Sequence, residues 1–360
     1  MRMKHLTVAA LTLLLSVSCS QRQEDYPFRN PDLPIDERID DLLKRLTAEE
    51  KVGQMMNTTP AIERLGIPQY DWWNEALHGV ARAGKATVFP QAIAMAATFD
   101  DDALYETFTM VSDEARAKYH QYQKDKEYDR YKGLTFWTPN INIFRDPRWG
   151  RGMETYGEDP YLTEKMGVAV TRGLQGDDPN YYKTHACAKH YAVHSGPEWN
   201  RHEFNAEATP RDLYETYLPA FEALVKEGDV QEVMCAYNRF EGKPCCSSDK
   251  LLIDILRNSW GYDNIILSDC GAIDDFWRKD KNTPRHETHP DAESASADAV
   301  LNGTDLECGG SYRALNKALA DGKISEKDLD VSLRRLLKGR FELGCSIRTS
   351  GFLILRYLTA

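Results

Sequence analysis

Residues 264–269 have the sequence Asn264-Ile265-Ile266-Leu267-Ser268-Asp269, a short apolar run that ends in a carboxylate. A run of this length and composition is typical of a buried parallel strand. Asp269 then lies where the strand emerges into a loop, which in a β/α barrel is the edge that carries the active site. Taken alone, Asp269 could equally cap the next helix. The choice depends on whether other strands end in the same way.

Several other short apolar runs alternate with helical stretches. The runs are Thr135 to Ile141, His185 to Tyr191, Glu232 to Tyr237 and Gly303 to Glu307. The predicted helices are Ile35 to Met55, Asp100 to Gln123, Tyr161 to Gln175, Pro210 to Glu227, Asp249 to Trp260, Ser311 to Ala320 and Leu329 to Gly344. This alternation predicts an α/β fold with a parallel sheet, and the chain length favours closure into a (β/α)8, TIM-like barrel. A doubly wound open sheet is the alternative, but no glycine-rich phosphate loop opens the first strand–helix unit.

The bulk composition limits the classes of function. The chain has 360 residues, a formal net charge of −11 and 42% hydrophobic residues. This length is within the range of about 200–400 residues for a single elaborated barrel. The negative charge argues against binding nucleic acid, because basic side chains are needed to neutralise phosphates. A neutral substrate is compatible with this charge.

The N-terminal residues have the anatomy of a signal peptide. Arg2 and Lys4 precede the apolar stretch Leu6 to Val17, which is too short to span a bilayer as a mature helix. Small residues before Cys19 resemble a lipoprotein processing site, so residues 1–19 are expected to be a lipoprotein-like signal peptide, with ordinary cleavage nearby as the alternative. Residues 20–34 are expected to be a tether. The protein is therefore expected to be exported to the periplasm or outer membrane, and to contact a membrane only through a lipid on Cys19.

The cysteines and histidines do not predict a metal site. Cys187, Cys235 and Cys270 lie in or at the ends of predicted strands, where free buried thiols are common. A disulfide from Cys245 or Cys246 could form in an exported protein, but the sequence leaves its partner open. No C-x-x-C motif occurs. The spacing of three nearby histidines also matches no zinc signature: His190, His194 and His202. No metal and no cofactor are expected.

Polar side chains suited to holding a sugar follow the predicted strands or lie in long loops beside them. Lys189 and His190 are adjacent at one strand end and can donate hydrogen bonds to vicinal hydroxyls, and Tyr237 ends the next strand. The other candidates are Arg151 and Arg201 in the loops, and Glu75 among aromatic residues. A pocket with a few convergent polar groups and flat aromatic faces suits a small polar ligand. The sequence therefore predicts a glycoside-binding site at this edge of the sheet.

Five motifs carry a family resemblance. They are Trp72-Trp73-Asn74-Glu75-Ala76-Leu77-His78-Gly79, Arg145-Asp146-Pro147-Arg148-Trp149-Gly150-Arg151-Gly152, Glu154-Thr155-Tyr156-Gly157-Glu158-Asp159-Pro160, Cys187-Ala188-Lys189-His190-Tyr191 and Ser268-Asp269-Cys270-Gly271-Ala272. In type and order they resemble glycoside hydrolase family 3, in its β-xylosidase branch. The resemblance extends from about Pro31 to Gly344, and residues 35–344 are expected to form the family's N-terminal barrel domain.

The resemblance implies a retaining β-glycosidase that forms a covalent glycosyl-enzyme on Asp269. It also implies that five residues hold hydroxyls of the sugar: Arg151, Lys189, His190, Arg201 and Tyr237. Glu75 stands where many β-glucosidases of the family carry Asp. The longer carboxylate crowds the space of a hydroxymethyl group, so the expected substrate is a terminal β-D-xylosyl residue of a xylo-oligosaccharide. A β-glucosidase is the alternative, because one methylene changes specificity by only about 1–3 kcal/mol.

The chain departs from the family pattern in two places. In this branch the general acid/base is implied to be a Glu of a second domain beyond the barrel, and after Gly344 the sequence stops resembling the family. Residues 345–360 are therefore expected to be a divergent tail left by truncation, and a non-catalytic sugar-binding barrel fragment is the alternative function. The family's β-N-acetylglucosaminidases carry an Asp-x-His acid/base, but the matching stretch here is Asn200-Arg201-His202. An amide cannot polarise a histidine as a carboxylate does, so no acid role is expected for His202.

Overall fold

The computed structural model describes residues 26–194, 196–280 and 284–345. The predicted signal peptide, the lipid on Cys19 and the tail after Cys345 lie outside the described residues. The predicted tether over residues 20–34 is too long. Phe28 within it is 1% exposed, and its carbonyl accepts a hydrogen bond from Arg38 Nε (3.0 Å). Burial of this ring attaches the end of the segment to the domain, so residues 26–34 belong to the folded unit.

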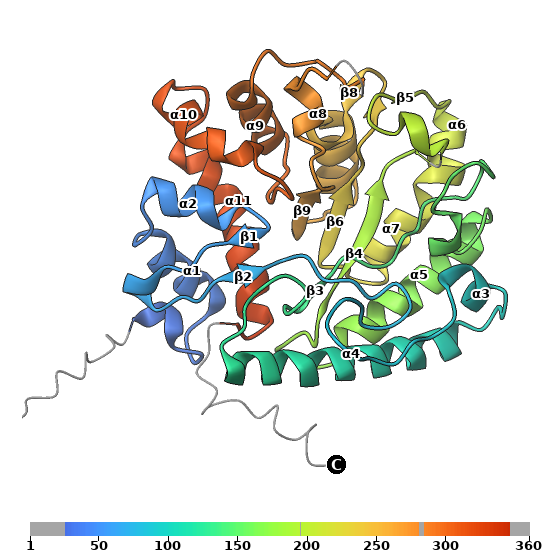
Figure 1. Ribbon diagram of the computed structural model, residues 1–360, viewed down its shortest axis with the longest axis horizontal. Helices are drawn as coiled ribbons and strands as arrows, with labels where there is room; N and C mark the ends of the chain where they lie inside the picture. The colour runs from blue at the N-terminus through green and yellow to red at the C-terminus, as the bar shows by residue number, and fades with distance from the viewer. Residues whose placement is uncertain (1–25, 195, 281–283, 346–360) are drawn as a thin grey trace, which may run out of the picture.

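Four of the predicted apolar runs form one parallel sheet. Its strands lie in the order β3 (Thr135–Phe136), β4 (His185–Tyr191), β6 (Glu232–Cys235) and β9 (Ile265–Ser268) (Figure 1). Every residue of these strands is buried, as expected for a sheet covered on both faces. Because the strands are parallel, their carboxyl ends meet at one edge, where Lys189, His190 and Asp269 emerge.

Single bridges and one antiparallel pair connect the two edges of this sheet. The parallel bridges join Leu267 with Leu306, Glu307 with Met56, and Asn74 with Phe136. Between them, β1 (Thr58–Thr59) pairs antiparallel with β2 (Tyr70–Asp71). The predicted strand Gly303 to Glu307 thus takes part only through Leu306 and Glu307. Regular ladders cover four strands, and isolated bridges supply the rest of the ring.

Helices surround the sheet. Those of the first half are α1 (Ile35–Leu43), α2 (Ala48–Gln54), α3 (Ala92–Ala96), α4 (Asp101–Asp125) and α5 (Pro160–Gln175). Those of the second half are α6 (Pro210–Asp212), α7 (Pro219–Lys226), α8 (Asp274–Trp277), α9 (Ala292–Leu301), α10 (Leu315–Ala320) and α11 (Glu326–Glu342). In Figure 1, α4 and α5 lie side by side, and α5 packs on β4. The helix α11 packs against α1, α2 and β9, so the last helix of the barrel closes onto the first.

Short elements complete the chain. Two π-helical segments, Leu213–Tyr217 and Asp249–Ser259, occupy parts of the predicted helices Pro210 to Glu227 and Asp249 to Trp260. The 3₁₀ helices are Pro27–Arg29, Glu63–Leu65, Gly152–Glu154, Glu198–Asn200, Cys245–Ser247 and Ser311–Ala314. A small three-stranded sheet contains β5 (Asn205–Ala206), β7 (Arg239–Phe240) and β8 (Lys243–Pro244).

The predicted helix Ile35 to Met55 is divided in two. Thr47 Oγ1 accepts a hydrogen bond from Glu50 N (3.2 Å), and Glu50 Oε2 accepts one from Thr47 N (2.9 Å). This capping box starts α2 anew, because the cap residue has an extended backbone that cannot continue α1. Asp100 caps α4, because its Oδ1 accepts a hydrogen bond from Ala103 N (2.9 Å).

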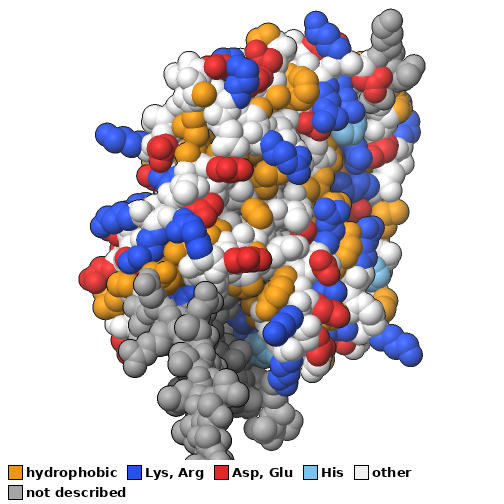
Figure 2. Space-filling view, turned by 60° about the vertical axis from the view of Figure 1, so that its left-hand side comes forward, with side chains coloured by type: hydrophobic (Ala, Val, Ile, Leu, Met, Phe, Trp, Pro, Cys, Tyr) orange, Lys and Arg blue, Asp and Glu red, His pale blue; other side chains and the backbone are white. Residues whose placement is uncertain are grey.

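The surface carries charges of both signs. Figure 2 shows Lys and Arg interspersed with Asp, Glu and apolar side chains over one face. In the part of the chain that the structure describes, no helix combines the length and apolar character that crossing a membrane requires.

Candidate active site

The fold brings the seven predicted site residues to the carboxyl edge of the sheet. One pocket there is lined by Arg151, His190, Arg201, Tyr237 and Asp269, together with Asn142 and Trp149. An adjoining hollow of about 310 Å³ is lined by Glu75, Arg151, Lys189 and Glu154. Arg151 lines both, so the two cavities are neighbours.

Asp269 presents one unpartnered carboxylate oxygen to this pocket. The residue is 8% exposed, and its Oδ1 accepts a hydrogen bond from Cys270 N (2.7 Å). Its Oδ2 accepts none from the described residues, since the Tyr237 hydroxyl donates to the Cys270 carbonyl (2.7 Å). Burial raises the pKa of Asp269, while Arg151, Lys189 and Arg201 oppose that rise. A desolvated oxygen close to cations is suited to attack an electrophilic carbon.

His190 is held as a neutral ring between two fixed partners. Asn142 Nδ2 donates to the His190 carbonyl (2.8 Å), so Asn142 Oδ1 is the acceptor for His190 Nδ1, 2.9 Å away. Nδ1 therefore carries the proton, and Nε2 accepts from Arg151 Nη1 (3.1 Å). Burial, followed by Arg151 and Lys189, lowers the pKa of His190 well below its ordinary value. Because Nε2 is an acceptor, it cannot donate to Asp269 Oδ2, 3.5 Å away.

Arg151 is oriented by Glu154, which the sequence interpretation did not assign to the site. Arg151 Nε and Nη2 donate to the two oxygens of Glu154 at 2.9 and 2.7 Å. Burial disfavours the charged guanidinium, but this bidentate pair outweighs it and raises the pKa of Arg151. The sequence signal that could have indicated this pair is the spacing of three residues between Arg151 and Glu154, across the 3₁₀ helix Gly152–Glu154. Asn140 Nδ2 also donates to Glu154 (3.3 Å), which fixes the carboxylate from its other side.

Glu75 and Lys189 form a second charged pair. Lys189 Nζ lies 3.9 Å from Glu75 Oε2, and Trp73 Nε1 donates to Glu75 Oε1 (2.7 Å). The Trp73 ring in turn stacks on Trp137, with centroids 5.5 Å apart. The carboxylate of Glu75 is therefore fixed at the wall of the adjoining hollow, where it can accept hydrogen bonds from a ligand.

Arg201 and Tyr237 form the far side of the pocket. The guanidinium carbon of Arg201 lies 4.9 Å from the centroid of the Tyr237 ring, and its Nη1 pairs with Glu198 (2.7 Å). His202, next to Arg201, contacts the buried carboxylate of Asp275 through Nδ1 (2.7 Å). The motif offers His202 only the amide of Asn200, but the fold supplies a carboxylate from Asp275, and the absence of an acid role for His202 stays a prediction. Asp275 is 73 positions away, so no local motif could reveal it.

The three histidines do not converge on a common point. His190 contacts Asn142 and Arg151, and His202 contacts Asp275, whereas the His194 ring lies against Phe204. Among residues 26–194, 196–280 and 284–345, no group of three or more His, Cys, Asp or Glu is arranged to hold a metal ion. The arrangement instead offers a carboxylate surrounded by hydrogen-bond donors, which suits a polyhydroxylated ligand.

The sequence comparison decides the family. Residues 41–338 match the description "Glycosyl hydrolase family 3 N terminal domain". The chain belongs to glycoside hydrolase family 3. The resemblance based on the five motifs is thereby confirmed.

Two relatives show where this family 3 chain stands. It is 50% identical over 340 residues to a xylan 1,4-beta-xylosidase of Xylanibacter ruminicola, a match that covers 93% of this chain and 39% of the relative. It is 42% identical to probable beta-D-xylosidase 7 of Arabidopsis thaliana, covering 89% of this chain and 43% of the relative. The chain thus spans about two fifths of the length of these relatives.

Solved structures confirm the barrel class of this family 3 chain. A GH3 exo-beta-xylosidase in complex with a xylobiose aziridine activity-based probe superposes with a TM-score of 0.81 at 32% identity, over 91% of this chain and 42% of that one. A beta-glucosidase from Listeria innocua in complex with isofagomine gives 0.70 at 28% identity, over 86% and 46%. The predicted TIM-like class is correct, with the irregularity that single bridges replace regular ladders in part of the ring.

The cysteine predictions for this family 3 barrel need correction. Cys235 and Cys270 are not free thiols, because they form the disulfides Cys235–Cys246 and Cys270–Cys308. The bridge that Cys245 or Cys246 could form is present at Cys246, whereas Cys245 is free, and Cys187 is free and buried as predicted. The chain folds Cys270 and Cys308 to a Cα separation of 4.4 Å, which sequence spacing cannot reveal. This disulfide immediately follows Asp269 and anchors its loop to the segment after Glu307.

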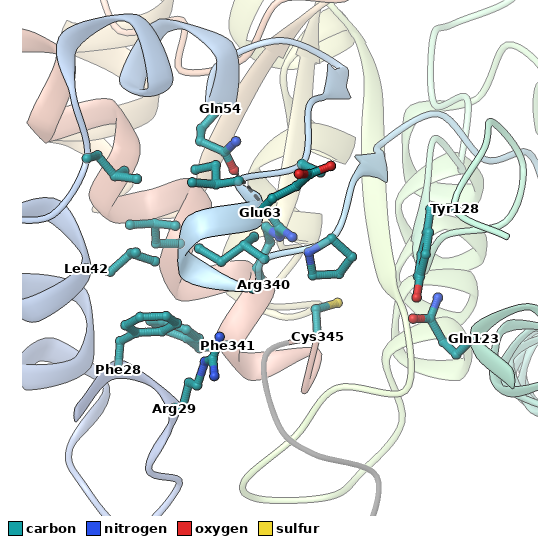
Figure 3. Close-up of a pocket in the computed structure, with 17 residues that line it drawn as sticks. Phe28, Arg29, Leu42, Gln54, Glu63, Gln123, Tyr128, Arg340, Phe341 and Cys345 are labelled. Carbon is teal, nitrogen blue, oxygen red and sulfur yellow. Dashed lines mark hydrogen bonds between the residues drawn. The ribbon is translucent and has the colours of Figure 1, made fainter. Parts of the chain in front are cut away.

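A larger hollow of about 600 Å³ lies away from this site of the family 3 barrel. It is lined by residues of α1 and α11, including Leu42, Arg340 and Phe341 (Figure 3). Gly339, next to Arg340, lies against His185 and Ile265, the first residues of β4 and β9. The hollow is therefore at the opposite end of the strands from Asp269, and none of the seven predicted site residues lines it.

Proposed function

We propose that this family 3 barrel belongs to a retaining exo-β-glycosidase that removes terminal β-D-xylosyl residues from xylo-oligosaccharides. The observation that carries the proposal is the unpartnered Oδ2 of Asp269 in a pocket lined by Arg151 and His190. The names of the relatives support a xyloside as substrate, since they are called β-xylosidases.

In the proposed reaction Asp269 Oδ2 attacks the anomeric carbon, and the bond to the leaving-group oxygen breaks. Water then attacks the same carbon and releases xylose, with net retention of configuration. Lys189, Arg151, Arg201 and Tyr237 would hold the sugar hydroxyls. His190, whose two ring nitrogens contact Asn142 and Arg151, would orient the Arg151 guanidinium toward the sugar. The proposal leaves the general acid to a part of the protein outside this barrel, as the family resemblance implies.

A β-glucosidase is the second candidate, because β-glucosidases of the family share the fold at 28% identity. We favour a pentose because Trp73 and Lys189 fix the Glu75 carboxylate at the wall of the hollow, where it limits the room for a hydroxymethyl group. Shortening this side chain with Glu75→Asp should raise the ratio of kcat/KM for an aryl β-glucoside to that for the β-xyloside by about tenfold or more. An unchanged ratio would show that Glu75 does not determine the sugar.

The decisive test is intact-protein mass after incubation with an activated 2-fluoro-β-xyloside. Its good leaving group needs no acid, so the experiment tests the nucleophile alone. We expect a mass increase of one fluoroxylosyl unit that maps to Asp269 and is absent in Asp269→Asn. The matched control is Asp263→Asn, an exposed carboxylate just before β9, which should still be labelled. No adduct on a cooperatively melting protein would favour the sugar-binding fragment instead.

We further propose export and lipidation at Cys19, on the basis of the N-terminal sequence. A Cys19→Ser variant expressed in a bacterial host should move from the membrane fraction to the soluble fraction. Membrane association of both forms would contradict a lipid anchor at this residue.

A further inference from the structure

Arg201 is held in place by contacts that leave part of its guanidinium available. Its Nη1 pairs with Glu198 Oε1 (2.7 Å), and its Nε donates to His202 Nε2 (3.3 Å). Two of the five N–H donors of an arginine are used in this way. The remaining donors can meet the hydroxyls of a sugar in the pocket, provided that the guanidinium plane is fixed. The inference below rests on the proposed function, because it concerns how Arg201 is presented to that sugar.

Asp275 reaches His202 from a different part of the chain. It lies in α8, soon after the loop that follows Asp269, and its side chain is fully buried. Its Oδ2 contacts His202 Nδ1 (2.7 Å), and its Oδ1 pairs with Arg285 Nη1. Both oxygens of this carboxylate are therefore engaged, one by the histidine and one by a cation.

These contacts determine the tautomer of His202. A carboxylate can only accept, so His202 Nδ1 must carry the proton that it donates to Asp275. The other ring nitrogen, Nε2, then has a free lone pair, and that is the acceptor that Arg201 Nε requires. Burial, followed by Arg201 and Arg285, lowers the pKa of His202 to about 4, so the ring is neutral near pH 7.

The ring is also fixed by packing. The centroids of His202 and Tyr237 are 4.4 Å apart, and Tyr237 lies beneath the Arg201 guanidinium. Arg201 thus donates a hydrogen bond to His202, and His202 donates one to Asp275. The Tyr237 ring packs against both Arg201 and His202.

We propose that Asp275 and His202 are positioning residues for the sugar subsite: Asp275 selects the Nδ1–H tautomer of His202, and His202 then fixes the orientation of Arg201. This role differs from that of an acid/base histidine, because Nε2 faces Arg201 and is used as an acceptor. We call the contacts from Asp275 through His202 to Arg201 the relay. The ligand that Arg201 then binds is the xylosyl residue that the proposed function places in the pocket.

The key variant is Asp275→Asn. Arg285 can only donate, so the oxygen of the introduced amide should turn toward it and the NH₂ group should face His202. That arrangement makes Nδ1 an acceptor and places the proton on Nε2, opposite the Nε–H of Arg201. Two donors then face each other, and we expect the concentration of 2-fluoroxyloside for half-maximal trapping to rise about tenfold. The trapping rate at saturation should change less than about threefold, because Asp269 is untouched.

Two further variants and one control make the experiment specific. In His202→Gln the side-chain oxygen can accept from Arg201 while the NH₂ group donates to Asp275, so this variant should stay close to wild type. His202→Leu keeps apolar bulk but loses both contacts, and should resemble Asp275→Asn. The matched control is Asp298→Asn, because Asp298 also pairs with a histidine, His289 (3.2 Å), at a site without Arg201. It should leave trapping unchanged, and melting curves establish that each variant is folded.

A second readout does not depend on turnover. Nitrogen-15 spectra of histidine- and arginine-labelled protein should show His202 as the Nδ1–H tautomer and a slowly exchanging Arg201 Nε–H. In Asp275→Asn the tautomer should change and the arginine proton should exchange faster. If the wild type is not labelled by the fluoroxyloside, the proposed function fails while these spectra still decide the relay. An Nε2–H tautomer in the wild type, or unchanged trapping in both Asp275→Asn and His202→Leu, would overturn the relay.

Discussion

Two histidine–carboxylate pairs lie at opposite ends of the same sheet and behave differently. At the beginning of the strands, His185 of β4 contacts Glu232 of β6 (3.1 Å), and both side chains are fully buried. At the carboxyl ends, His190 of β4 lies 3.5 Å from Asp269, which follows β9. Strand and residue types are alike, so the difference comes from the surroundings.

The surroundings differ in the positive charge that acts on the carboxyl group. Burial raises the pKa of Glu232 well above its ordinary value, and burial, followed by Arg116 and Lys338, lowers that of His185 to about 3, so this pair is neutral. Burial also raises the pKa of Asp269, but Arg151, Lys189 and Arg201 oppose it. Burial alone therefore neutralises a carboxyl group, whereas burial beside cations can keep it as a nucleophile. The positions of the cations distinguish a structural pair from a reactive one.

The largest expected effect is the contrast between Asp269→Asn and Glu232→Gln. The first removes the attacking oxygen and should lower release of nitrophenol from 4-nitrophenyl β-D-xyloside by at least about a thousandfold. The second makes the same chemical change at the opposite end of the sheet and should leave this rate within about threefold of the wild-type value. If Asp269→Asn and Glu232→Gln lowered the rate of nitrophenol release by similar factors, the two ends of the sheet would not differ in reactivity as the surrounding charges indicate.

A smaller effect should follow from Arg151→Lys. A lysine cannot engage both oxygens of Glu154 and also reach His190, so the charge near Asp269 is retained but its geometry is lost. We expect the same rate to fall about ten- to hundredfold, as for the loss of a charged hydrogen bond. Arg148→Lys is the control in the same loop, because Arg148 is exposed and pairs with Asp146. Equal activity of the two variants would mean that charge alone suffices at position 151.

The smallest expected effect is the contribution of Glu232 and His185, at the beginning of the strands, to the pH dependence of the free energy of unfolding. The unfolded chain loses the Glu232 proton above about pH 4.3 and the His185 proton above about pH 6.5, whereas the folded pair stays neutral. Between these values the two contributions to the pH dependence cancel. Above about pH 6.5 the folded state holds one more proton, so stability should fall with pH by up to about 1.4 kcal/mol per unit.

Glu232→Gln removes that proton difference. Its free energy of unfolding, measured with urea between pH 6.5 and 8, should therefore increase relative to wild type as the pH rises. Parallel curves would show that the folded pair holds no additional proton above about pH 6.5, and the comparison between the two ends would then fail.

Much of the scaffold could be predicted from local sequence. The run His185 to Tyr191 coincides with β4, and the predicted helix that begins at Asp100 is α4, with Asp100 as its N-cap. The predicted strand Glu232 to Tyr237 is two residues longer than β6, which ends at Cys235. The difference arises because a run of apolar residues can continue past the last hydrogen bond of the sheet. The segment Gly303 to Glu307 has strand composition but makes only isolated bridges.

The sequence by itself determined the alternation of strands and helices, and the positions of Lys189, His190, Tyr237 and Asp269 at or just beyond strand ends. Those features depend on residue periodicity and on local motifs, and both can be recognised within a short stretch of chain. Only the tertiary structure decided which residues serve as their partners. Asp275 for His202 and Cys308 for Cys270 come from distant parts of the chain. Such pairings depend on where the barrel places separate loops, and no local pattern encodes that distance.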